Sequence, residues 1–166
     1  TRQELVLLYD ILFMGESSLV YQRLSEKTGL IYSYDSYLEQ YDNAGSLHFY
    51  YDVRPARLQE AVRLTAELLR ELCSEAGKLL DYVRPVYVDN AAMALDDAEN
   101  FGIDCVYRHI LDDGVEPSIE ARAKAYASVT PERIEALARD LFRPENAVAV
   151  VYGDPDKVDT AAIRAQ

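Results

Sequence analysis

Residues 17–33 read SSLVYQRLSEKTGLIYS, and the apolar spacing changes from helical to extended within this segment. The serines at its start are typical helix N-caps, and the helical run that follows them ends at Gly29. From Leu30 onward apolar and polar residues alternate as in a β-strand, with Leu30, Tyr32 and Tyr34 on one predicted face. The segment therefore predicts a helix that leads directly into a strand.

The flanking sequence extends this pattern in both directions. A helix is predicted over 3–14, and a turn at 42–45 leads to a second strand at 46–53, which makes an antiparallel hairpin. Gly77 and Gly102 are expected to break the later helices, and the apolar run 147–152 predicts a buried strand. The helices expected after the hairpin cover residues 55–76, 79–99, 103–111, 118–127 and the segment from 131. We expect one α+β domain over 1–166, with a mostly antiparallel sheet and helices packed on one face.

Composition excludes several classes of protein. The chain has 166 residues, enough for about one domain. Its 17 basic and 29 acidic residues give a net charge of −12, so it lacks the basic surface that nucleic-acid binding requires. No apolar run approaches the ~18–20 residues of a membrane-spanning helix. Two cysteines without a CxxC spacing weakly favour a reducing, cytoplasmic compartment.

The chain by itself shows no catalytic motif. Its two histidines, His48 and His109, cannot form the paired-histidine motif of zinc peptidases. The carboxylates of the 96–99 cluster are interpreted as solvated side chains, because neighbouring helical positions diverge. Those near His109 are interpreted in the same way, because the group has a single imidazole and lies where a helix meets a loop. These carboxylates belong to Asp96, Asp97, Glu99, Asp112 and Asp113. Tyrosines are concentrated in the predicted hairpin, where they suit strand faces and could also contact an extended peptide.

The segment 17–33 resembles a signature of the insulysin, pitrilysin and mitochondrial processing peptidase family of zinc metallopeptidases, the inverzincins. The family pattern is roughly S-S-x-L-[FY]-x-x-L-R-E-K-x-G-L-x-Y-S and belongs to the non-zinc-binding, C-terminal-type domain. The resemblance continues through Thr130-Pro131-Glu132, through the segment 143–147 and into the closing 150–154. It implies a clamshell of repeated α+β domains, and a strand expected before the 3–14 helix is missing, as in an N-terminally truncated domain.

The resemblance also implies roles for particular residues. In active family members one domain carries zinc on an H-x-x-E-H motif, and the opposing domain supplies an arginine and a tyrosine that hold the substrate carbonyl. Tyr32 matches the family tyrosine, whereas the family arginine falls on Ser25, which is short and uncharged. Tyr32 is thus the expected donor, Tyr32 and Tyr34 are the expected substrate contacts, and no metal ligand is expected here.

Two functions remain open from the sequence. The first is a non-catalytic, substrate-embracing domain of a zinc-dependent metalloendopeptidase, inactive alone and partnered by a zinc-carrying domain of the same chain or of another subunit. The alternative is a catalytically inactive, peptidase-like scaffold for assembly or peptide binding, which the serine at position 25 favours. An unrelated enzyme that uses Tyr32 or the Asp96–Asp97 pair is the least favoured hypothesis.

Overall fold

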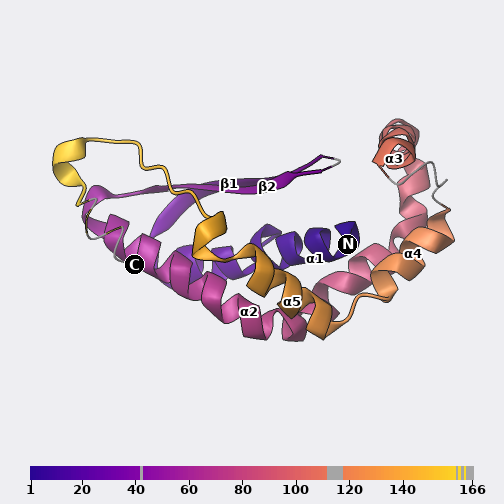
Figure 1. The fold of residues 1–166 in the computed structure, drawn as a ribbon, viewed down its shortest axis with the longest axis horizontal. Coiled ribbons are helices and arrows are strands. Elements are labelled where there is room, and N and C mark those ends of the chain that lie inside the picture. Colours follow the sequence, from indigo (N-terminus) through magenta and orange to yellow (C-terminus); the bar gives the residue numbers. More distant parts are fainter. Residues whose placement is uncertain (42, 112–117, 160, 162, 164–166) are drawn as a thin grey trace.

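The computed structural model describes residues 1–41, 43–111, 118–159, 161 and 163 (Figure 1). The chain begins with helix α1 (Arg2–Phe13), for which Thr1 and Glu4 form a capping box. A π-helix (Tyr21–Glu26) follows and leads into the antiparallel hairpin of β1 (Ile31–Gln40) and β2 (Gly45–Val53). The remaining helices are α2 (Leu58–Asp89), α3 (Ala98–Leu111), α4 (Ile119–Ala127) and α5 (Pro131–Leu141), and short 3₁₀ turns occupy Pro55–Arg57, Ala91–Asp96, Pro144–Asn146 and Pro155–Lys157.

The helices cover one face of the hairpin. Figure 1 shows α1 beneath the strands and α2 and α5 beneath α1. Leu47, Phe49 and Tyr51 of β2 pack on the core from the inner face, and the Tyr9 hydroxyl donates to the Ser36 carbonyl at 2.8 Å. The Phe13 and Phe49 rings lie 5.2 Å apart. This arrangement confirms the predicted α+β class with an antiparallel sheet.

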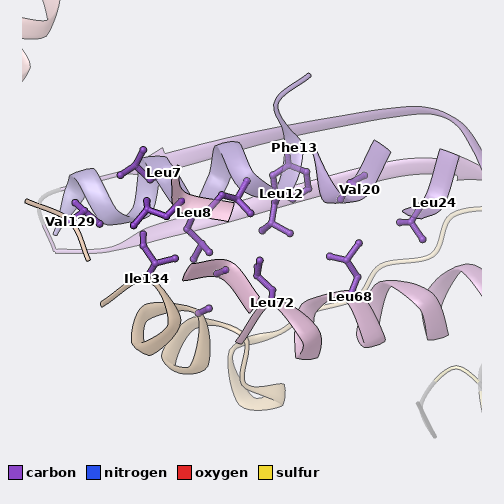
Figure 2. Close-up of a cluster of buried hydrophobic side chains, with 14 of the residues drawn as sticks. Leu7, Leu8, Leu12, Phe13, Val20, Leu24, Leu68, Leu72, Val129 and Ile134 are labelled. Atoms are coloured by element: carbon purple, nitrogen blue, oxygen red, sulfur yellow. The ribbon is translucent and has the colours of Figure 1, made fainter. Parts of the chain in front are cut away.

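The core lies where α1, the π-helix, α2 and α5 converge (Figure 2). Each of these elements contributes leucine or isoleucine side chains that are fully buried, because their apolar residues recur on one helical face. The labelled members include Leu7, Leu8, Leu12, Leu24, Leu72 and Ile134, all with no exposed surface. Burying a side chain of this size contributes about 1.5–3 kcal/mol, so this cluster fixes the platform under the hairpin.

Helix α2 differs from the prediction, since it continues for 32 residues through Gly77 and Pro85. Gly77 does not end the helix; it lies directly against the start of α5. A Cβ atom at this position would lie 2.7 Å from Cβ of Pro131. Packing against α5 therefore explains the glycine.

The limits predicted for the helix over 79–99 are wrong at both ends. Residues from 79 onward continue α2, which ends at Asp89, and a 3₁₀ turn follows. Helix α3 then continues through Gly102, where the sequence predicted a break between helices. Two later predictions are confirmed. Ser118 caps α4 by accepting from the Ala121 N–H at 3.0 Å, and Pro131 opens α5.

The predicted buried strand at 147–152 is also wrong. These residues form no ladder with β1 or β2 and are largely exposed, Val148 at 91% and Val150 at 87%. Figure 1 shows this segment returning from α5 along the hairpin toward the start of α2. An apolar run shows that a segment prefers burial, but it forms a strand only where a neighbouring strand edge accepts its hydrogen bonds.

Candidate functional site

Tyr32 lies at a bulge near the start of β1. Ile31 pairs with Val53 and Tyr34 pairs with Tyr51, so two residues of β1 oppose one residue of β2 between these pairs. A bulge of this kind moves the following residues to the opposite face of the sheet. Tyr32 is accordingly 71% exposed, whereas Tyr34 is half-buried. The two tyrosines do not share a face, contrary to the alternation predicted from the sequence.

Arg54 follows β2 directly and contacts Tyr32. Its Nη2 atom donates to the Tyr32 hydroxyl at 2.8 Å, and the guanidinium carbon lies 5.6 Å from the centroid of the tyrosine ring. The pairing of Ile31 with Val53 explains this contact, because it places the end of β2 beside the start of β1. The result is an exposed tyrosine hydroxyl with a cation against it.

Two other basic side chains of this region form ion pairs with carboxylates. Arg57 Nε lies 2.6 Å from Glu60 Oε2, and this hydrogen bond holds the pKa of the Glu60 carboxyl below its usual value. Lys157 Nζ lies 3.0 Å from Asp154 Oδ2. Arg54 instead donates to the Tyr32 hydroxyl, and within the described ranges it forms no ion pair with a carboxylate.

A shallow depression adjoins this pair. Arg54, Pro55, Ala56 and Lys157 line it, and its volume is about 600 Å³. The depression joins the corner before α2 to the 3₁₀ turn near the C-terminus, two segments that are remote in sequence. Two basic side chains thus line the same depression on a chain whose net charge is −12.

Ser25 lies in the π-helix that precedes the bulge. Its side chain is half-buried, and its carbonyl accepts from the Gly29 N–H at 2.7 Å where the helix closes. Arg23, two residues earlier, is tied to α2 through Glu71, with 2.5 Å between Nη2 and Oε1. The π-helix therefore directs its arginine toward α2. Short π-helical segments occur often at functional sites, although they are rare elsewhere.

Tyr34 contacts the core. Its hydroxyl donates to the Phe13 carbonyl at 3.3 Å, and its ring meets Phe49 edge-on at 6.1 Å. These contacts join β1 to the end of α1. The structure thus brings Tyr32 together with Arg54, not with Tyr34.

The outer face of the hairpin also carries a stacked cluster that the sequence did not reveal. The Tyr37 ring lies 4.1 Å from the His48 ring, and the Tyr37 and Tyr50 hydroxyls are 2.7 Å apart. The hydrogen bond with Tyr50 raises the pKa of Tyr37 to about 12. The His48 ring nitrogen Nε2 lies 2.8 Å from the Ser46 hydroxyl, on the face opposite Phe49. Only the hairpin register, which pairs Tyr37 with His48, would have indicated this cluster.

The described residues do not fit a zinc site, because no group of three or more His, Cys, Asp or Glu side chains among them could hold a metal ion. The Asp97 carboxylate accepts from the backbone N–H and the side chain of Asn100, which lowers the pKa of Asp97. His109 is exposed, and the carboxylates of Asp112 and Asp113 that the sequence placed beside it lie outside the described residues.

No helix within the described ranges has both the length and the apolarity to cross a membrane.

Comparisons with known proteins agree with the signature in residues 17–33. Residues 1–82 match the family described as the peptidase M16 inactive domain. The chain is 29% identical over 156 residues to uncharacterized zinc proteases of Mycobacterium tuberculosis and Mycobacterium bovis, a match that covers 90% of this chain and 34% of theirs. A zinc protease of Streptomyces coelicolor, also uncharacterized, is 24% identical over 149 residues, 86% of this chain and 31% of the relative. The chain thus spans about a third of the length of these relatives.

Proposed function

Because this chain belongs to the peptidase M16 family as a domain of the inactive type, we propose that it holds the peptide substrate within a larger zinc metalloendopeptidase. The observation that carries the proposal is the exposed Tyr32 hydroxyl with Arg54 2.8 Å away. Tyr32 occupies the family tyrosine position in the signature segment, at the start of a strand that the core supports from below. The hydroxyl is therefore both accessible and fixed in place.

The chemistry of peptide cleavage explains why such a donor is useful. Negative charge develops on the carbonyl oxygen as the peptide bond is attacked, and a preorganised donor stabilises it. The Tyr32 hydroxyl accepts the hydrogen bond from Arg54, so its own proton is free to point at a substrate oxygen. Tyr34 supports this site from the inner face by anchoring β1 to α1 through the Phe13 carbonyl.

The proposal requires a second domain that binds zinc. The described residues offer no metal site, whereas the relatives are called zinc proteases and are about three times as long. We therefore assign zinc to another domain of the same chain or to a partner subunit. The contribution of this domain is to bind and orient the peptide, and it is inactive by itself.

Replacement of Tyr32 tests the proposal. In the complete protein Tyr32→Phe removes only the hydroxyl, and kcat on peptides should fall by about 10²-fold or more, as for other oxyanion donors. Tyr82→Phe is the matched control, because Tyr82 is 78% exposed on α2 and lies outside the site. Unchanged turnover by Tyr32→Phe with an intact fold would contradict the proposal.

A second candidate function rests on Ser25. Serine at the family arginine position removes a charge expected to contact the substrate, which favours a peptidase-like scaffold that binds peptides without cleaving them. Assays of the complete protein with zinc present separate the two candidates. Zinc-dependent cleavage supports the peptidase, and peptide binding without cleavage supports the scaffold.

A further inference from the structure

We infer that Arg54 supplies the positive charge that Ser25 cannot, and that it acts as a positioning residue for Tyr32. The inference rests on the proposed function and adds a residue that the family signature does not contain. Arg54 lies at the end of β2, 29 positions from Ser25 in the sequence. Only the pairing of Ile31 with Val53 brings it to Tyr32.

The geometry gives Arg54 two effects on Tyr32. The 2.8 Å hydrogen bond from Nη2 fixes the direction of the hydroxyl, and the guanidinium 5.6 Å from the ring centroid restrains the ring plane. A hydroxyl that accepts a charge-assisted hydrogen bond becomes a better donor through its own proton. Arg54 thereby strengthens the bond that Tyr32 makes to a peptide carbonyl oxygen.

Three other basic residues, in the π-helix, in the 3₁₀ turn after β2 and in the C-terminal segment, are paired with carboxylates. Arg23 is paired with Glu71, Arg57 with Glu60 and Lys157 with Asp154. Arg54 is exposed, and its hydrogen bond to Tyr32 uses one of the five N–H groups of a guanidinium. It can therefore hold the Tyr32 hydroxyl in place and act on the substrate through that hydroxyl.

Arginine also fits this role better than lysine would. The planar guanidinium can lie over the tyrosine ring and donate to its hydroxyl at the same time, whereas an ammonium group is a point charge. Arg54→Lys should consequently keep part of the function, and Arg54→Gln should lose it. This graded response distinguishes positioning of Tyr32 from a general loss of stability.

The test compares Arg54→Gln, Arg54→Lys, Tyr32→Phe and the double variant Tyr32→Phe/Arg54→Gln in the complete protein. Cleavage of fluorescein-labelled casein gives kcat and KM, and anisotropy of the same probe gives its dissociation constant. Arg63→Gln is the matched control, because Arg63 is an exposed arginine paired with Glu67 on α2. Thermal unfolding confirms that each variant is folded.

We expect Arg54→Gln to lower kcat about tenfold with a smaller effect on KM, and Arg54→Lys to recover part of the loss. The double variant should lose little more than Tyr32→Phe alone, because Arg54 acts through that hydroxyl. If the protein does not cleave casein, the same order of variants should hold for the dissociation constant.

Each contrary result has one meaning. If Arg54→Gln behaves like Arg63→Gln while Tyr32→Phe is impaired, the role of Arg54 is overturned and the proposed function stands. Fully additive losses in the double variant also overturn it. If Tyr32→Phe itself has no effect on cleavage or binding, the proposed function fails.

Discussion

Gly77 of α2 and Pro131 of α5 are in close contact, since a Cβ atom on Gly77 would lie 2.7 Å from the Pro131 Cβ and 2.8 Å from Glu135 Oε1. The two helices cross at a distance that only glycine permits. This contact closes the core beneath α1, where Ile134 of α5 is fully buried. The support under the hairpin therefore depends on a residue with no side chain.

Substitution at this crossing should loosen the core. Gly77→Ala forces α2 and α5 apart, and overpacking of this kind costs about 1–3 kcal/mol, offset by up to about 1 kcal/mol of helix propensity. Hydrogen–deuterium exchange should become faster in peptides from both helices. The control is Gly102→Ala in α3, where an added Cβ meets no atom within 4 Å. Equal exchange in the two variants would show that the contact is unimportant.

Asp10 should make stability depend on pH. Burial raises the pKa of Asp10, although the hydrogen bond from the Tyr87 hydroxyl opposes this shift. A raised pKa means that the folded protein holds the proton more tightly than the unfolded chain, so stability falls as the pH rises through the folded-state value. Asp10→Asn keeps an acceptor for Tyr87 and removes the half-buried charge.

Chemical denaturation at several pH values measures the effect of Asp10. The free energy of unfolding of Asp10→Asn, relative to the unmodified protein, should improve as the pH rises above the ordinary aspartate value of 3.8. A relative stability that is constant, or that declines over this range, would show that ionisation of Asp10 does not destabilise the folded protein.

Tyr34 should affect stability more than turnover. Tyr34→Phe removes the hydrogen bond to the Phe13 carbonyl and leaves the ring contact with Phe49 in place, so the expected loss is about 0.5–1.5 kcal/mol. Thermal unfolding and casein cleavage are measured together. A loss of kcat comparable to that of Tyr32→Phe would mean that Tyr34 acts on the substrate directly.

Ser25→Arg tests the departure from the family signature. The variant restores the family cation in the half-buried turn before the bulge. If Arg54 already supplies the charge, kcat should change little in the unmodified protein but should recover in the Arg54→Gln background. Failure to recover, with the fold intact, would show that positions 25 and 54 do not serve the same function.

The sequence predicted the elements whose limits are set locally. Ser118 caps α4 and Pro131 opens α5 because caps and first-turn prolines act on the backbone of their own helix. The hairpin strands were predicted from the alternation of their own residues, which is also a local property. Gly77 was misinterpreted because a glycine required by helix crossing has the same sequence pattern as one that ends a helix.

The site was predicted only in part. The signature identified Tyr32, but strict alternation placed it on the same face as Tyr34. The bulge between Ile31 and Tyr34 changes the face, and no residue type in this segment indicates a bulge. Arg54 was missed since its contact with Tyr32 depends on strand register, a long-range property. The exposed 147–152 run shows the same limit, because burial of a strand depends on what lies beside it.

Photocrosslinking from position 32 tests the central claim most directly. Tyr32 is replaced by p-benzoylphenylalanine in the complete protein, and labelled casein is irradiated in its presence, with the same replacement at Tyr82 as the reference. The account predicts a covalent casein adduct from position 32 and none above background from position 82. Equal labelling from both positions, or labelling from position 82 alone, would contradict the claim that this domain holds the substrate at Tyr32.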